Sequence, residues 1–291
     1  MISPLVRRRR LAAELIRLRD EHGYSSARVA TEIGVSRQRI SELENGRVVP
    51  NLELVVKILQ LFEAGEQTSQ QLMAIAHDAQ ERGWWATFAA EMGTRQALYA
   101  DLEAGASEIH EYQMVYLPGL LQIPPYTEVR VLMDRPDKAT YSHARALEAR
   151  AGRQLILERP DGPSYEVILD ELAVRRFAAP APVIAEQLDH LVMVGHERPT
   201  VTIRVLPLAV EIRQHAVPRS AFFTYRYPDP QDPVVAAVDT VTDDLVLTDE
   251  SDVNRYLDLY ARLQEAALSP GDSLDYLAAT AEEIRRTIHN G

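Results

Sequence analysis

Three polar side chains, spaced to lie on one face of a short helix, carry hydrogen-bonding groups that match the edges of base pairs. They are Arg37, Gln38 and Ser41. Arginine can pair with guanine, glutamine with adenine, and serine with a base or with phosphate. Short polar and cationic side chains that suit phosphate contacts lie around them: Ser25, Ser26, Ser36, Arg39, Asn45 and Arg47. These residues predict contact with double-stranded DNA, the first three at base edges and the others at the backbone.

The elements that must position this face are two short helices joined by a tight turn. Gly34 supplies the left-handed backbone conformation that a helix exit needs, and Ser36 stands where the next helix takes its N-cap. Apolar residues that could pack the two helices together are Val29, Ile33, Val35, Ile40 and Leu43. Others recur at helical spacing on both sides, at Leu11, Leu15, Leu18, Leu52, Val55, Ile58 and Leu59. The pattern predicts four or five helices over about residues 5–64, with a recognition helix at about 36–45 in the major groove.

This segment resembles the Cro/C1-type (Xre-like) repressor domain over its whole length. That family combines an apolar first helix with the pattern A-x-x-x-G-V-S and, further on, E-N-G-x-x-x-P. The matching residues here are Ala30, Gly34, Val35, Ser36, Glu44, Asn45, Gly46 and Pro50. The resemblance implies an all-α helix-turn-helix domain over residues 1–66 and a transcriptional regulator of the XRE family.

Glu42 departs from the family pattern, in which an arginine commonly follows the second serine. An acidic side chain at this place either accepts a hydrogen bond from cytosine N4 or repels phosphate. Alternatively, Glu42 faces Arg39 or Lys57 and forms an ion pair within the domain. The residues alone leave these alternatives open.

The basic residues are concentrated at the start of a chain whose net charge is −12. Residues 1–66 hold eleven Lys and Arg against nine Asp and Glu, whereas the remainder holds twenty against thirty-four. This asymmetry suits a protein whose first part approaches phosphate while its acidic part stays away. The run Arg7–Arg10 either contacts phosphates or a minor groove, or forms a solvated face of the first helix.

Composition excludes several classes of protein. With 291 residues, 46% of them hydrophobic, the chain can form two domains that each bury a core. It has no cysteine, and no apolar run approaches the ~20 residues of a membrane helix. No apolar segment of a secretory signal follows the N-terminal arginines. We expect a cytoplasmic protein that is nucleoid-associated when bound to DNA.

No catalytic constellation stands out, and we expect no enzyme activity, no cofactor and no metal site. None of the eight histidines stands in an H-x-x-x-H or H-E-x-x-H arrangement. The chain also lacks G-x-S-x-G, G-x-G-x-x-G and a P-loop pattern. Two acidic pairs, Asp243-Asp244 and Asp249-Glu250, could bind a divalent cation, but the flanking strands favour a solvated acidic hairpin.

Beyond residue 66 the pattern predicts a linker helix over 67–83 and an α+β domain over 84–291. Strands are expected at 109–117, 165–169, 201–206, 221–227, 234–241 and 245–248, the last two paired through Thr242-Asp243-Asp244. Helices are expected at about 138–158, 171–177 and 183–195. Two further helices, Ser251–Leu268 and Ser273–His289, either mediate dimerisation or pack over the sheet.

Several segments of this second part resemble the actinobacterial domain of unknown function 5753 (DUF5753). Tyr112 to Tyr126 carries its P-G-L-L-Q-x-x-x-Y signature. Further matching segments follow in order: Arg150–Gln154, Leu169–Glu171, Glu186–Leu188, Val201–Pro207 and Ala267–Ser269. The resemblance implies a transcriptional regulator that joins an Xre-like domain to this one. For some relatives it also implies an antitoxin-like role beside a small partner protein of the DUF397 type.

The role of the acidic second domain stays open at this stage. It either binds or sequesters a basic protein partner, or senses a small ligand. Candidate residues for an effector or partner site are Trp84, Trp85, Arg150, Arg153 and Glu171. The structural alternative is an internal salt-bridge network for the charged residues, and a position at the junction between the two domains for the tryptophans. Because one helix-turn-helix makes few contacts, we expect a homodimer on a palindromic operator.

Overall fold

The computed structural model describes residues 2–133, 141–240 and 244–290, and the chain forms two compact units. Unit 1 comprises Met1–Ala86, Tyr99–Ala106 and Tyr227–Pro233. Unit 2 comprises Thr87–Leu98, Ser107–Arg226 and Val234–Gly291. Two short segments from further along the sequence therefore belong to the same unit as the N-terminal helices.

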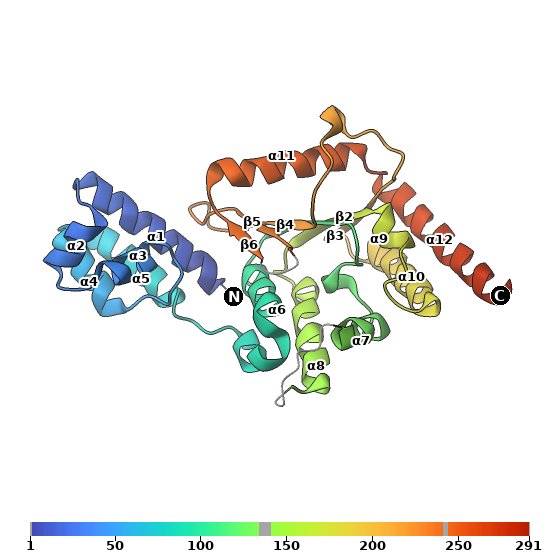
Figure 1. Ribbon diagram of the computed structural model, residues 1–291, viewed down its shortest axis with the longest axis horizontal. Coiled ribbons are helices and arrows are strands. Elements are labelled where there is room, and N and C mark those ends of the chain that lie inside the picture. The colour runs from blue at the N-terminus through green and yellow to red at the C-terminus, as the bar shows by residue number, and fades with distance from the viewer. Residues whose placement is uncertain (1, 134–140, 241–243, 291) are drawn as a thin grey trace. The chain divides into compact units, whose positions relative to one another are not determined.

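Unit 1 contains five α-helices in its N-terminal segment, drawn blue to cyan in Figure 1. They are α1 (Pro4–Glu21), α2 (Ser26–Glu32), α3 (Arg37–Glu44), α4 (Leu52–Leu61) and α5 (Glu66–Asp78). The side chains of Ser3, Ser25, Ser36 and Asn51 each accept a bond from a backbone N–H at the start of α1 to α4, respectively. Such caps satisfy N–H groups that have no partner inside the helix. The expected all-α helix-turn-helix domain is confirmed.

One apolar core joins all five helices. Its buried members include the residues expected from helical spacing, namely Leu11, Leu15, Leu18, Val29, Ile40, Leu43, Val55, Ile58 and Leu59. Ile33 and Val35, in the turn, are partly buried against it. The segment predicted as a linker, 67–83, contains most of α5, and Leu72, Ile75 and Ala76 complete this core. This helix is therefore part of the packing of unit 1.

Two glycines determine how α3 is placed in unit 1. Gly34, between α2 and α3, has a φ of 70°, a left-handed conformation that glycine adopts without strain. Gly46, just after α3, has a φ of 58° and lies against α1, where an added Cβ would be 3.0 Å from the carbonyl oxygen of Arg8. Only glycine permits both the turn and this close approach.

Unit 2 is built on a six-stranded sheet with the order β3-β2-β1-β4-β5-β6. The strands are β1 (Glu108–Gln113), β2 (Ser164–Asp170), β3 (Val201–Leu206), β4 (Phe222–Arg226), β5 (Val235–Val238) and β6 (Leu245–Leu247). β1, β2 and β3 are parallel, and β4, β5 and β6 add antiparallel strands on the other side of β1. A mixed sheet of this kind, with helices around it, confirms the α+β prediction.

The helices of unit 2 cover both faces of the sheet. They are the first part of α6 (Ala89–Glu103), α7 (Pro124–Met133), α8 (His143–Gln154), α9 (Glu171–Arg175), α10 (Ala181–Glu197), α11 (Glu250–Ala266) and α12 (Pro270–Asn290). Short 3₁₀ turns lie at Trp84–Phe88, where unit 1 meets unit 2 in the chain, and at Gly119–Leu121, Leu155–Glu158 and Arg213–His215. In Figure 1, α11 lies along one face of the sheet, and α7 and α8 lie on the opposite side.

The α11 face has an aromatic core. Tyr112 of β1 pairs in register with Phe222 of β4, and both pack with Tyr260 and Leu263 of α11. The ring of Tyr260 stacks on His110, with centroids 4.5 Å apart, and its hydroxyl donates to Glu166. α11 is thus packed over the sheet, one of the two alternatives that its sequence left open, while α12 packs against α10 and β3.

The expected strands and helices of unit 2 are largely confirmed, with shifted ends. The strand expected at 109–117 ends at Gln113, before the turn that Pro118 and Gly119 mark. The helix expected from 138 is described from His143, and residues 138–140 lie outside the described part. β5 and β6 pair as expected, although Val241, Thr242 and Asp243 between them also lie outside it.

We predict that Gly46→Ala destabilises unit 1 more than Gly23→Ala. Gly23 has a similar φ of 65°, but an added Cβ meets nothing within 4 Å, so that variant loses only about 1–2 kcal/mol for the left-handed backbone. Gly46→Ala adds the clash with α1. Urea unfolding followed by tryptophan fluorescence measures the loss, because both tryptophans, Trp84 and Trp85, lie in unit 1. Equal losses for the two variants would contradict the close approach.

Candidate nucleic-acid interface and ligand pocket

The helix α3 presents a row of exposed cations that have no partner within the described residues. Arg37 and Arg39 are exposed at its first turn and make no ion pair or side-chain hydrogen bond there. Ser36 caps the helix by accepting from the backbone N–H of Arg39. The arginines are therefore available to an external anion or base, at the end of the helix whose dipole also favours negative charge.

Gln38 and Glu42 lie one turn apart on α3 and are bonded to each other. Nε2 of Gln38 donates to Oε1 of Glu42 at 2.8 Å. The ion pairs considered for Glu42, with Arg39 or Lys57, do not form within the described residues. A glutamine amide has two N–H donors and a carbonyl acceptor. Glu42 uses one donor and leaves the other donor and the acceptor exposed, the combination that adenine requires.

The end of α3 forms a second polar group, which includes Arg9 of the run Arg7–Arg10. Asn45 donates from Nδ2 to the carbonyl oxygen of Ser41 at 2.6 Å, and its own carbonyl accepts from Nη1 of Arg9 at 2.7 Å. Burial and the nearby guanidinium groups of Arg47 and Arg8 lower the pKa of Arg9. A phosphate would relieve this repulsion, and Arg47 itself is exposed without a partner in the described chain.

The two serines expected at phosphates stand at the start of α2. Ser25 is exposed and caps the helix by accepting from the backbone N–H of Arg28. Ser26 donates its hydroxyl to Glu44 at 2.6 Å, and Glu44 also pairs with Arg19 at 2.7 Å. The hydroxyl proton of Ser26 thus belongs to a network that ties α1, α2 and α3 together. Only the oxygen of Ser26 is left to accept from another group.

The run Arg7–Arg10 does not form a solvated face of α1, because Arg7 and Arg10 are paired with carboxylates inside unit 1. Arg10 is only 8% exposed, and its Nη1 lies 2.5 Å from Asp229 and 3.2 Å from Asp232. Arg7 reaches Asp232 at 3.1 Å. The reason is helical spacing: positions 7 and 10 share a face of α1, and that face meets the segment Tyr227–Pro233 within unit 1.

A third carboxylate from the later sequence holds the start of α1. Asp101 accepts from the hydroxyl of Ser3 at 2.7 Å and from the backbone N–H of Leu5 at 3.1 Å, and it lies 3.8 Å from Arg8. Burial raises the pKa of Asp101 despite these bonds. Of the four arginines in the run, Arg9 alone points to the end of α3.

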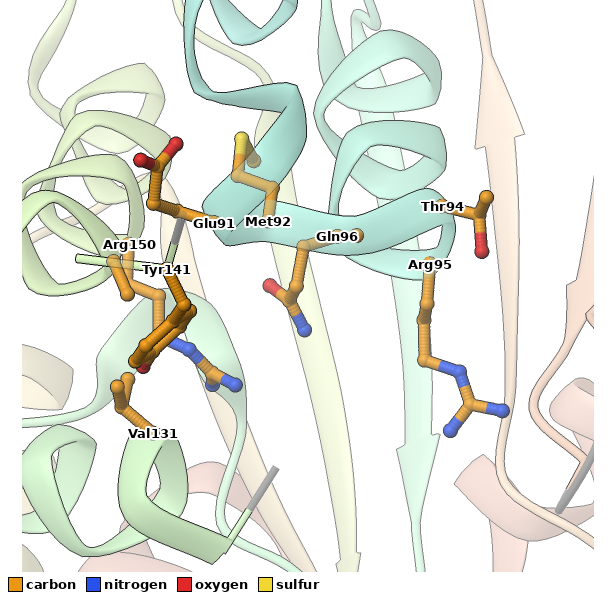
Figure 2. A pocket seen from close by; sticks show the side chains of 10 residues that line it. Glu91, Met92, Thr94, Arg95, Gln96, Val131, Tyr141 and Arg150 are labelled. Atoms are coloured by element: carbon orange, nitrogen blue, oxygen red, sulfur yellow. The ribbon is translucent and has the colours of Figure 1, made fainter. Parts of the chain in front are cut away.

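In unit 2, Arg150 lines a pocket of about 310 Å³ between α6, α7 and α8 (Figure 2). Gly93 interrupts α6 at this point with a φ of 65°, which shapes one wall. In Figure 2 the polar ends of Arg150 and Gln96 point toward one another, while Glu91 turns away. Other charged groups of the wall are engaged nearby: Glu91 pairs with Arg145 at 3.1 Å, and Arg95 with Asp239 at 3.0 Å and Asp244 at 3.1 Å.

The other candidates from the sequence do not converge on one place. Arg153 is buried and donates to Gln96, next to this pocket. Glu171 instead accepts from the backbone N–H of Leu208, from Tyr276 and from Arg175. These bonds lower the pKa of Glu171, that from Leu208 most, so the carboxylate joins α9, α12 and the loop after β3. For Glu171 the structure favours the internal network.

Trp84 and Trp85 lie in unit 1 and pack against each other edge to face, with ring centroids 6.1 Å apart. Trp85 is buried. The acidic pairs also have local partners where they are described: Asp244 pairs with Arg95, and Asp249 caps α11. Across the described residues, no group of three or more His, Asp and Glu side chains is arranged to hold a metal ion. No helix among them is long and apolar enough to cross a membrane.

Two family models match this chain. A helix-turn-helix model (HTH_3) matches residues 15–66, from α1 to the start of α5. The model of a domain of unknown function (DUF5753) matches residues 96–279, from α6 to α12. Searches of curated proteins and of solved structures gave no match.

We predict that Glu171→Gln lowers the thermal stability of the chain at neutral pH and that the difference shrinks in acid. The folded state lowers the pKa of Glu171, so its carboxylate contributes stability above the unfolded pKa. That contribution is lost as pH falls through the folded pKa. Melting curves from pH 7 down to about pH 3 measure it, with Glu282→Gln, on the exposed face of α12, as a control. A pH-independent difference would argue against a charge-based role.

Proposed function

Because this chain belongs to the DUF5753 family and carries a Cro/C1-type helix-turn-helix, we propose that it is a sequence-specific transcriptional regulator that contacts bases through α3. Arg37, Gln38 and Ser41 face the base edges. Arg39, Arg47, Asn45 and the serines at the start of α2 and α3 lie at the phosphates. The observation that carries the proposal is that Arg37 and Arg39 have no partner among the described residues. They lie at the exposed, capped start of a helix whose opposite face is packed into the core.

Arg9 joins the phosphate-contacting set in this proposal. Its guanidinium is fixed on the carbonyl of Asn45, beside Arg47, at the end of α3. Arg39 at the start of the helix, and Arg9 with Arg47 at its end, then flank the groups that face the bases. Phosphate contacts on both sides would fix the register of the helix in the groove.

We propose further that the chain acts as a homodimer on a palindromic operator, because one unit of this size offers few base contacts. Unit 2 would supply the dimer contact, bind a partner, or sense a ligand. A basic protein is the partner that the net charge of −12 favours, and the resemblance suggests a small DUF397-type protein and an antitoxin-like role. We propose no enzymatic reaction, and DNA binding implies the cytoplasm as its place of action.

Arg37→Ala should lose about 1–3 kcal/mol on a duplex selected by the wild-type chain and lose base preference at one position. Its loss on random DNA should be small. Arg47→Ala should weaken binding to both duplexes and reduce the slope of log affinity against log salt by about one. Fluorescence anisotropy at several salt concentrations measures these effects. Arg17→Ala, an equal change of charge on α1, serves as control.

If Arg37→Ala weakens selected and random duplexes equally, Arg37 does not contact a base. If neither variant differs from Arg17→Ala, α3 does not bind DNA at all. The two variants thus test separately whether α3 binds DNA and whether Arg37 is placed at a base.

Glu42→Ala should reduce the preference for adenine at one operator position by several-fold, because Gln38 loses the bond that orients its amide. Affinity for random DNA should rise, because a negative charge leaves the DNA face. Glu42→Gln keeps an acceptor for Gln38 but removes the charge, so it should raise random affinity and keep the preference. Should both variants retain full preference, Glu42 has no part in orienting Gln38.

A further inference from the structure

A second pocket of unit 2, about 340 Å³ in volume, lies between α11, the edge of the sheet and the loop before β4. α11 contributes Asp252, Arg255, Tyr256 and Leu259, whose spacing of three, four and seven residues puts them on one face of the helix. Phe222 of β4 and Leu247 of β6 lie across from them, and residues 217–220 close the side. All of these residues belong to one unit and lie within the described ranges.

The floor of this pocket is apolar and continuous with the core of unit 2. Phe222 is buried, and its ring centroid lies 5.2 Å from that of Tyr256. Leu247 and Leu259 pack partly buried against the same core. Val217, which also lines the pocket, is 72% exposed. Leu247 and Leu259 thus present part of their apolar surface to the pocket, above the buried ring of Phe222.

The polar groups at the rim of the pocket are mainly hydrogen-bond donors. Arg219 is exposed and makes no ion pair or side-chain hydrogen bond within the described residues. Arg255 is 79% exposed at its side chain and approaches Asp252 only at 3.6 Å. The hydroxyl of Tyr256 has no hydrogen-bond partner in the described part of the chain. The lining therefore holds two guanidinium groups and one carboxylate; Asp249, outside the lining, also lies near Arg255, so Arg219 is the cation of this rim that lacks a carboxylate partner within the described residues.

Tyr256 can act as a hydrogen-bond donor here. A tyrosine phenol is protonated at neutral pH, and burial and then the nearby Asp252 raise the pKa of Tyr256 further. A protonated phenol and two guanidinium groups are all donors to an anion. A carboxylate in particular matches the paired N–H groups of arginine.

The loop that leads to this pocket is held in an unusual conformation. Gln214 and His215 are consecutive non-glycine residues with φ values of 60° and 54°. Such backbone strain persists only where surrounding contacts impose it, and it tends to cluster at ligand sites. The contacts here include the bond from His215 N–H to the carbonyl of Ile212 and the pair of Arg213 with Glu265 of α11.

We propose that this pocket binds a small organic acid whose apolar body lies on Leu247 and Leu259, above the buried Phe222, and whose carboxylate is held by Arg219 and Arg255. A volume of about 340 Å³ suits a small molecule. A compact, fully hydrated anion such as inorganic phosphate would gain nothing from the apolar floor. The site goes beyond the proposed function, and its test requires no DNA.

Calorimetric titration of the full chain with three compounds that share one apolar group separates the contribution of the charged head from that of the apolar group. Phenylbutyrate, phenylbutanol and phenylbutylamine differ only in an anionic, neutral or cationic head. We expect saturable binding of one phenylbutyrate per chain, at least tenfold weaker binding of the alcohol, and none of the amine. Decanoate replaces the aryl body with an alkyl chain and should also bind, because the floor is apolar without a specific polar partner.

Matched variants then test whether the carboxylate of the ligand binds to the arginines at the rim of the pocket. Arg219→Gln and Arg255→Gln should each weaken phenylbutyrate about tenfold and leave the alcohol unchanged, because only the anion uses the guanidinium groups. Tyr256→Phe should weaken it by a smaller factor. Arg286→Gln removes the same charge from the exposed face of α12 and should have no effect. All four positions are exposed or half-buried, so these variants should fold.

Equal affinity for the three heads would overturn the proposal, because it would mean simple partition onto an apolar surface. Unchanged phenylbutyrate binding in both arginine variants would equally overturn it. So would the absence of saturable binding of both phenylbutyrate and decanoate at millimolar concentration. None of these outcomes bears on the contact of α3 with DNA.

Discussion

The contact between α1 and the end of α3 is the constraint on which the rest of unit 1 depends. Gly46 leaves α3 in a left-handed conformation, and its lack of a Cβ lets the backbone of Arg8 come close. This approach puts Arg9 on the carbonyl of Asn45 and leaves Arg47 beside it. The angle at which α3 leaves the core, and hence the face that it presents, follows from that crossing. The apolar core then fixes the crossing from the other side through Ile40 and Leu43.

The same geometry separates the arginines of unit 1 into those that are paired with carboxylates and those that are exposed at α3. Carboxylates of Asp101, Asp229 and Asp232 neutralise the arginines that share the inner face of α1. The cations of α3 and its end have no such partners among the described residues. The surface available to an anion is therefore much smaller than the arginine content suggests, and it is concentrated at α3. Buried ion pairs of this kind are costly to break one partner at a time, so they also hold the late segments in unit 1.

Local signals in the sequence predicted the helices of unit 1, because caps, glycine exits and helical spacing act within a few residues. The same holds for most strands of unit 2. The fate of Arg7 and Arg10 could not be predicted, since their partners lie more than 200 residues away in the sequence. The bond between Gln38 and Glu42 could have been predicted from the sequence, because residues four apart on a helix are neighbours. The pocket under α11 was not, because it needs β4, β6 and α11 brought together by the sheet order.

The most direct test of the central claim is to select duplexes from a random library with the wild-type chain and with an Arg37→Ala, Gln38→Ala double variant, and to sequence both pools. A palindromic motif in the wild-type pool that is lost in the variant pool is the predicted result, and it would mean that α3 specifies the operator. No motif, or the same motif in both pools, would contradict the assignment of the base contacts to α3.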